Sequence, residues 1–324
     1  MTRIVSASRV QQAMPAESKT AVIAALAGDV AVAVTKFVAA AFSGSSAMFS
    51  EGVHSVVDSA DSALLLFGIA RSRRPADEDH PLGHAHELYF WSFVVAVMIF
   101  GLGGGVTIYE GIAKLRHPGT LDNPFWDYVV LAVAGILQAA SLVVGWRQFR
   151  KQIGDAPFLR AVHRSKDPSV FTVVIEDIVG IAGIAVAFAG VFLSHVFGDA
   201  RFDAAGSVLI GLMLAAVAVL IGNEIRGLLI GESADPAMVR EIRKLAEADP
   251  AVDRANPPVT IQLGPESVLV ALELQFALRA SAAEVTEAVD RIERAIQRRF
   301  PVVQQIYIEA ESIKQTSKPT PLAR

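Results

Sequence analysis

Hydrophobic residues gather in long blocks before residue 231 and in short periodic patterns after it. Five blocks reach the roughly 20 apolar residues that a helix needs to cross a bilayer. A sixth has ionisable residues in its amphipathic first half and a strongly apolar second half, which favours another span. The six predicted spans cover residues 21–42, 47–70, 88–113, 125–149, 170–197 and 204–230.

The charges that flank these blocks indicate which side each loop faces. Six spans put both termini on one side of the membrane. If that side is the cytoplasm, the cytoplasmic loops carry nine Lys and Arg residues and the outer loops carry three, which fits the positive-inside rule. We therefore expect a multi-pass membrane protein with both termini cytoplasmic, a short arm at 1–18 and a transmembrane domain at 19–230.

The residues after 230 show the shorter periodicities of a soluble domain. Helical spacing is seen at 236–248 and 282–300, and strand-like patterns are seen at 259–263, 268–276 and 303–309. The order helix, strand, strand, helix, strand predicts a small two-layer α+β domain over 231–312. We expect residues 313–324 to form a disordered tail.

The second span carries ionisable side chains at membrane depth, where each charge costs on the order of 2.5–3.5 kcal/mol. His54 and Asp58 are four residues apart and Asp61 is seven from His54, so all three lie on one helix face. An imidazole with two carboxylates suits a divalent cation of borderline hardness. The alternative is a polar contact between helices, with Asp58 paired to Lys36.

The fifth span holds a second pair of acids, Glu176 and Asp177, inside an otherwise apolar helix. Adjacent helical residues point about 100° apart, so we expect one of the two to face the same site as His54 and Asp58. A solvated helix end is the alternative, but the apolar run that follows places the pair at least one turn inside.

The loop after the second span alternates acidic and imidazole groups. Asp77, His80 and His84 lie within eight residues of one another and form a second candidate metal site. Acidic loops with histidines are also often only solvated, and that alternative stays open.

Composition excludes several other functions. The chain has no cysteine, so disulfides and thiolate metal sites are excluded. A net charge of −4 gives no indication of nucleic-acid binding. The chain contains neither His-Glu-x-x-His nor Gly-x-Ser-x-Gly, which disfavours a hydrolase. We expect no enzyme and no cofactor.

Together these features resemble the cation diffusion facilitator family over about residues 18–311. The resemblance rests on SSAMFSEGVHSVVD at 45–58, on RPAD at 74–77 and HPLGH at 80–84, on the six spans and on the α+β tail. It implies a six-transmembrane-helix bundle followed by a small cytoplasmic α+β domain of ferredoxin or metallochaperone type. Family members are typically homodimers that exchange a cytoplasmic metal ion for external protons.

The resemblance also implies ligand sets. A membrane site carries over to His54, Asp58 and Asp177, and the loop site to Asp77, His80 and His84. Two departures are visible. Val173 stands where most members have His or Asp, so that Glu176, Asp61 or water would complete the membrane site. The adjacent pair Glu176 and Asp177 resembles the branch that includes zinc transporter nine.

The second departure is that no histidine follows His195, which favours a dimerisation role for the C-terminal domain. Glu309 and Glu311 are candidate metal ligands there, with a plain charged strand end as the alternative.

The expected function is export of a divalent transition metal by metal/proton antiport across the plasma (inner) membrane. Zinc comes first through the resemblance, and mixed nitrogen and oxygen ligands also suit Fe²⁺, Co²⁺, Mn²⁺ or Cd²⁺. The competing hypothesis is a non-transporting membrane metal sensor or scaffold with a degenerate site, which Val173 favours.

Overall fold

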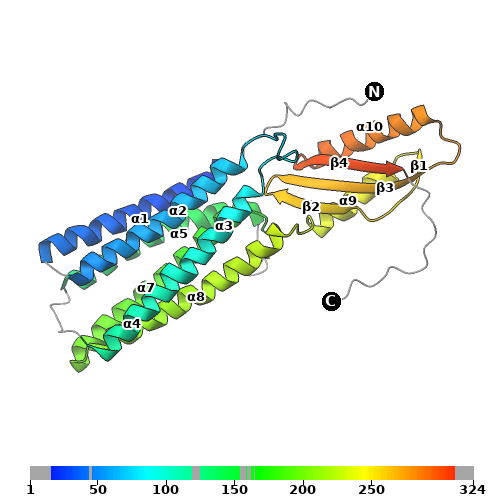
Figure 1. The fold of residues 1–324 in the computed structure, drawn as a ribbon. Coiled ribbons are helices and arrows are strands. Elements are labelled where there is room, and N and C mark those ends of the chain that lie inside the picture. Colours follow the sequence, from blue (N-terminus) through cyan, green and yellow to red (C-terminus); the bar gives the residue numbers. More distant parts are fainter. Residues whose placement is uncertain are drawn as a thin grey trace. The chain divides into compact units, whose positions relative to one another are not determined.

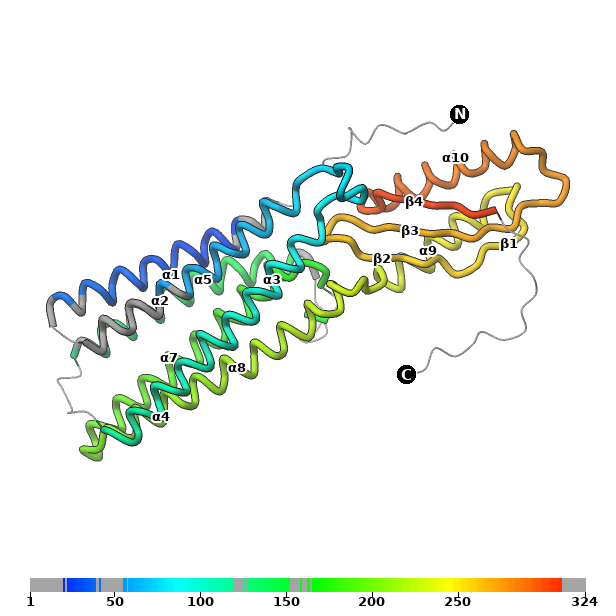
Figure 2. Tube along the Cα trace, viewed as in Figure 1, coloured from blue at the N-terminus to red at the C-terminus, as the bar shows by residue number. Residues whose placement is uncertain are grey.

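The computed structural model of the chain describes residues 16–43, 46–118, 125–153, 158, 162–163 and 165–310. The chain divides into two compact units, residues 1–229 and 230–324. The first is helical and the second combines helices with a sheet (Figures 1 and 2). The predicted N-terminal arm lies largely outside the described residues, as do the predicted tail and Glu311.

Long helices make up the helical unit. They are α1 (Ala16–Ser43), α2 (Ser46–Ser72), the continuous run α3 (Glu87–Met98), η1 (Ile99–Val106) and α4 (Thr107–Arg116), then α5 (Phe125–Ile153), α7 (Pro168–Phe197) and α8 (Arg201–Leu229). Asp167 caps α7, because its side chain accepts the backbone N–H of Ser169 and Pro168 follows at the first helical position. Gly198, at a φ of 68°, ends that helix.

Four of the predicted spans meet the length and hydropathy that a membrane crossing requires. Within the described residues these are 87–116, 127–151, 168–197 and 201–229. The other two predicted spans lie in helices of 28 and 27 residues, α1 and α2. Their status as spans stays a prediction.

Helix α8 packs tightly against the helix run of α3, η1 and α4. A Cβ atom added at Gly111 would come within 2.8 Å of the Val208 backbone nitrogen, and one at Gly211 within 2.8 Å of the Ile108 nitrogen. Such close backbone approach requires residues without a side chain. The π-helical turn η1 lies beside this contact.

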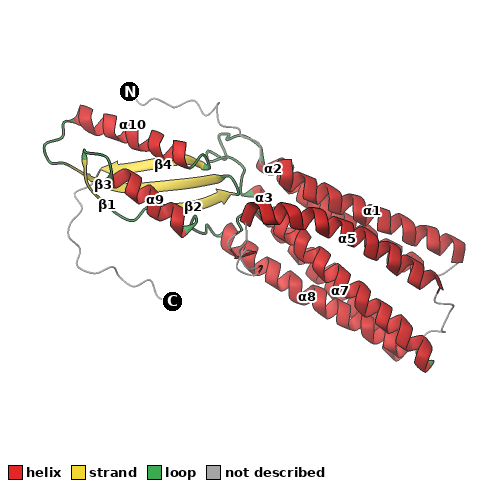
Figure 3. Ribbon diagram, turned by 180° about the vertical axis from the view of Figure 1, so that it is seen from behind, coloured by secondary structure: helices red, strands yellow, loops and turns green. Residues whose placement is uncertain are grey.

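The second unit is an α+β domain, as predicted. Its elements are α9 (Pro236–Glu247), β1 (Val252–Ala255), β2 (Val259–Gly264), β3 (Ser267–Phe276), α10 (Ala282–Arg299) and β4 (Val303–Ala310). Strands β1 and β2 pair antiparallel with β3, and β4 pairs parallel with it. Helices α9 and α10 cover one face of the sheet (Figure 3).

The periodicities predicted both helices and three of the strands within one or two residues at each end. Strand β1 was missed, so the predicted order of helix, strand, strand, helix, strand was wrong by one strand. With only four residues, Val-Asp-Arg-Ala, β1 has no alternating apolar pattern, and its pairing with β3 is interrupted by a register shift. Its position depends on its partner strand rather than on its own sequence.

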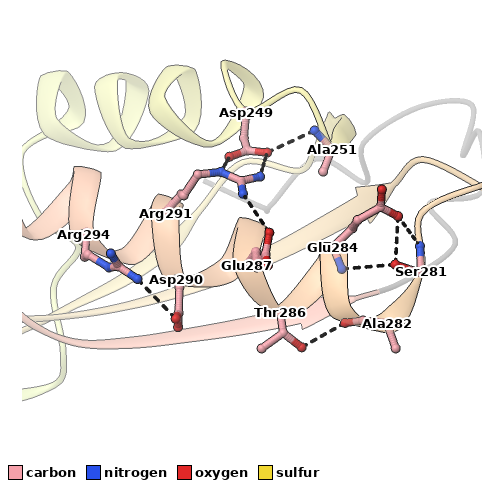
Figure 4. Close-up of polar contacts among 10 residues, drawn as sticks. All are labelled: Asp249, Ala251, Ser281, Ala282, Glu284, Thr286, Glu287, Asp290, Arg291 and Arg294. Carbon is pink, nitrogen blue, oxygen red and sulfur yellow. Dashed lines mark hydrogen bonds and ion pairs between the residues drawn. The ribbon is translucent and has the colours of Figure 1, made fainter.

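Several polar side chains in this unit are paired (Figure 4). The Arg291 guanidinium donates two hydrogen bonds to Asp249, at 2.9 and 3.0 Å. These bonds hold the pKa of Asp249 below its usual range. Ser281 and Glu284 form a capping box at the start of α10, which holds the pKa of Glu284 down in the same way.

Candidate metal centres

The loop between α2 and α3 brings its three predicted ligands together. In the described residues, Asp77, His80 and His84 form the one group whose potential ligand atoms all lie within 4.8 Å of one another. The Asp77 carboxylate lies 3.1 Å from His80 Nδ1 and 3.4 Å from His84 Nε2. The two imidazole rings lie 4.2 Å apart, centre to centre.

Backbone hydrogen bonds fix this loop. Asp77 Oδ1 accepts the His80 N–H at 2.7 Å, and the His80 carbonyl accepts the N–H groups of Asp77 and Gly83. Gly83 has a φ of 83°, a conformation that side-chain-bearing residues rarely adopt. The turn that carries His80 into His84 therefore depends on glycine.

The His84 ring is oriented by a neighbouring carbonyl. Its Nδ1 lies 3.2 Å from the Pro75 carbonyl oxygen, which can only accept, so Nδ1 carries the proton. Nε2 is then left to face the Asp77 carboxylate. A lone pair on nitrogen facing a carboxylate oxygen is favourable only with a proton or a cation between them, and this support of a ligand histidine by a carbonyl is usual in metal sites.

Charge in the loop favours a cation. Slight desolvation raises the pKa of Asp77, but the His80 hydrogen bonds and the nearby imidazoles outweigh it and hold this pKa below its usual range. Asp77 is therefore ionised at neutral pH. Two imidazoles and one carboxylate are a zinc-type ligand set with one coordination position left open.

The second group of acids lies inside the helical unit, on α1 and α2. Asp61 is 7% exposed, and its Oδ1 has no hydrogen-bond partner. Its carboxyl group is repelled by those of Asp58 and Asp29. Asp29 of α1 accepts a hydrogen bond from Ser62 of α2 at 2.8 Å. Helix α1 thus adds an acid to the group on α2.

On α7 the two adjacent acids have different surroundings. Glu176 is half-buried. Among the neighbouring acids, Asp61 repels its carboxyl group most strongly and Asp29 comes next. Asp177 is 4% exposed and lies against α5, where Gln138 Nε2 donates to its Oδ1 at 2.6 Å. The Ser141 hydroxyl is close to this carboxyl group, but neither it nor Asp177 Oδ2 completes a hydrogen bond of good geometry.

His54 and Val173 are two positions of the predicted membrane site for which the structure describes no ligand. The His54 side chain lies outside the described residues, so its place relative to Asp58 and Asp177 stays a prediction. Val173 is 1% exposed and packs in an apolar cluster with residues of α1, α2, α3, η1 and α8, among them Leu65 and Ile99. The position at which a fourth ligand is usual therefore contributes to helix packing.

Sequence reasoning missed two participants. Asp29 was visible only as an acid within an apolar segment, a signal sufficient to add it to the group. Gln138 is one of two amides in the fourth apolar block, and nothing in its neighbourhood indicates that it contacts Asp177. Only the packing of α5 on α7 reveals that contact.

Helices long and apolar enough to cross a membrane, buried acids within the helical unit and an α+β unit after it are features of a membrane protein that handles cations. Residues 22–229 match the family described as "Cation efflux transmembrane domain". The chain belongs to this cation efflux family, which confirms the resemblance to cation diffusion facilitators.

Three relatives show the range of similarity. "Proton-coupled zinc antiporter SLC30A9, mitochondrial" of Xenopus laevis is 32% identical over 79% of this chain and 46% of its own length. "Metal tolerance protein C4" of Arabidopsis thaliana is 32% identical over 72% of this chain and 52% of its own length. "Cation-efflux pump FieF" of Serratia proteamaculans (strain 568) is 27% identical over 87% and 89%.

These matches confirm the similarity to the zinc transporter nine branch. The chain spans about half the length of the first of these curated relatives.

Proposed function

We propose that this chain exports divalent transition-metal ions, with zinc as the first candidate, in exchange for protons. The observation that carries the proposal is the group of acids inside the helical unit. Asp61 and Asp177 are both buried, and each has one carboxylate oxygen without a hydrogen-bond partner. Buried carboxyl groups are costly unless they bind a cation or a proton.

The mechanism follows from the chemistry of these ligands. Carboxylate and imidazole groups bind a metal only after losing their protons, so metal and protons compete for one site. In our proposal His54, Asp58 and Asp177 hold the metal, with Glu176, Asp61 or water completing the set. If the site opens to each side in turn, the proton gradient drives metal outward. The relatives named as a proton-coupled zinc antiporter and a cation-efflux pump support this direction.

The finer architecture belongs to the same proposal. It comprises six spans, with α1 and α2 counted as the first two, and a cytoplasmic ferredoxin-like domain over 231–312 that serves in homodimerisation. We place the protein in the plasma membrane with both termini inside. Asp77, His80 and His84 form a second metal site in a cytoplasmic loop. Zn²⁺ leads the substrates, followed by Fe²⁺, Co²⁺, Mn²⁺ and Cd²⁺.

Flux in inside-out vesicles tests the proposal. Asp58→Ala and Asp177→Ala should each abolish proton-gradient-driven Zn²⁺ uptake, because each removes a ligand. Glu110→Gln is the matched control, since Glu110 is an exposed acid on α4. Undiminished uptake by both alanine variants would remove this assignment. A panel of the five metals at two pH values then ranks the substrates.

One observation favours a second candidate, a non-transporting membrane metal sensor. Val173 fills an apolar cluster at the usual ligand position, as expected of a site that has lost a ligand. A metal-dependent rise in thermal stability, without flux for any metal of the panel, would decide for the sensor.

A further inference from the structure

The contact between Gln138 and Asp177 joins two helices at a buried acid. Gln138 belongs to α5 and Asp177 to α7, and the amide donates to Asp177 Oδ1 at 2.6 Å. A hydrogen bond to an ionised acceptor is shorter and stronger than one between neutral groups. This bond fixes one of the two carboxylate oxygens.

A glycine on each of the two helices lies beside this contact. A Cβ atom added at Gly180 of α7 would lie 2.9 Å from Gln138 Cδ, so the amide rests against a part of α7 that has no side chain. At Gly145 of α5, an added Cβ would lie 4.0 Å from Asp177 Oδ2. The first glycine gives the amide its place, and the second adds no side chain of its own beside the other carboxylate oxygen.

The two oxygens of Asp177 consequently have different roles. Oδ1 is held by a donor, whereas Oδ2 is buried and has no hydrogen-bond partner. A carboxylate with one oxygen fixed and the other without a hydrogen-bond partner presents a lone pair in a defined direction. Partners that orient metal ligands act in this way, and their loss commonly weakens metal binding about 10–100-fold.

We propose that Gln138 is a positioning residue of the membrane metal site, acting through Asp177, so that the fourth span takes part in metal binding. The inference rests on the proposed function, because it requires Asp177 to be a ligand. Val173, one turn before Asp177, packs in an apolar cluster and leaves the site with few ligands. Exact orientation of the ligands that remain then matters more.

Zn²⁺ binding to the purified full-length chain tests the proposal. All variants carry Asp77→Ala, which removes a ligand of the loop site. The measured Zn²⁺ binding isotherm then reports the membrane site without a contribution from the loop site. Gln138→Met preserves the shape of the side chain and removes the donor, and we expect it to weaken Zn²⁺ binding about 10–100-fold. Gln148→Met is the matched control, because Gln148 is a buried amide on the same helix, about 15 Å further along its axis.

A double-mutant cycle separates positioning from helix packing. If Gln138 acts through Asp177, adding Gln138→Met to Asp177→Asn should weaken binding by less than about twofold beyond the single variant. Additive losses, or wild-type affinity of Gln138→Met, would overturn the proposal. If Asp177→Asn itself binds Zn²⁺ normally, the membrane-site assignment has failed instead.

A second variant guards against misfolding of Gln138→Met. Gly180→Ala leaves every polar group in place, and its methyl group displaces the Gln138 amide, the mobile end of a side chain. We expect Gly180→Ala to weaken Zn²⁺ binding in the same direction. Unchanged affinity in a folded Gly180→Ala protein would also contradict the proposal.

Discussion

Two buried acids of the helical unit have surroundings opposite to those of two paired acids in the α+β unit. In the α+β unit, Asp249 is bound by Arg291 and Glu284 closes a capping box. In the helical unit, Asp61 and Asp177 are buried, and each leaves one oxygen without a partner. Among the described residues, every buried side-chain polar atom without a hydrogen bond belongs to the helical unit.

The difference separates structural charges from functional ones. A buried acceptor without a partner costs about 1–3 kcal/mol, so acids held in this way weaken the fold that contains them. Buried groups of this kind call for an explanation, and cation binding supplies one, because a bound cation provides the missing partner. Paired acids such as Asp249 need no ligand to account for their place.

Among the substitutions that test this difference between the two units, Asp61→Asn is expected to have the largest effect. Asp61→Asn replaces a buried carboxyl group of α2 with a neutral amide. We expect proton-driven Zn²⁺ uptake into inside-out vesicles to fall on the order of 100-fold. Thermal unfolding of the purified protein should shift upward, because a neutral amide costs less to bury than an ionisable carboxyl group. Loss of stability with normal uptake would place Asp61 among the structural charges and contradict the distinction drawn between the two units.

An intermediate effect is expected at Asp249, where the substitution should lower stability and leave transport unchanged. Asp249→Asn should destabilise the α+β unit by about 1 kcal/mol, allowing for the exposure of Arg291 to solvent, and should leave Zn²⁺ uptake unchanged. Hydrogen exchange of the α9 and α10 amides measures the loss.

The pH dependence has a definite sign. Because the pKa of Asp249 is lowered in the folded state, the stabilisation is complete above the ordinary value of about 4 and disappears as the pH falls through the native value. Asp249→Asn should therefore flatten the decline of wild-type protection below about pH 4. An equally steep decline in the variant would show that other groups cause it.

The smallest effect is expected at the start of α10. Ser281→Ala removes the side chain that accepts the Glu284 N–H, so amides of the first turn should exchange faster, by less than about tenfold. Transport and the protection of β3 should not change. Thr286→Ala is a suitable comparison, because its hydroxyl bonds to Ala282 within the helix and caps no free N–H group.

Periodicity in the sequence was sufficient for much of the fold. It predicted α9, α10, β2, β3 and β4, because each contains enough residues to show its own repeat. Strand β1, with four residues, has no such repeat and is defined by its pairing with β3. The loop ligands were predictable for a related reason. Asp77, His80 and His84 lie within eight residues of one another, so a local turn brings them together without contacts from distant parts of the chain.

The sequence by itself determined that acids lie within apolar helices, because the length and composition of each segment show both the apolar helix and the acids inside it. The cost of burying those charges follows from the same information. The tertiary structure alone decided which helix each acid faces. Adjacent positions on α7 point in different directions, so the rotation and packing of that helix send Asp177 to Gln138 on α5 and bring Glu176 under the influence of Asp61. Contacts between distant residues depend on helix packing, which no local pattern encodes.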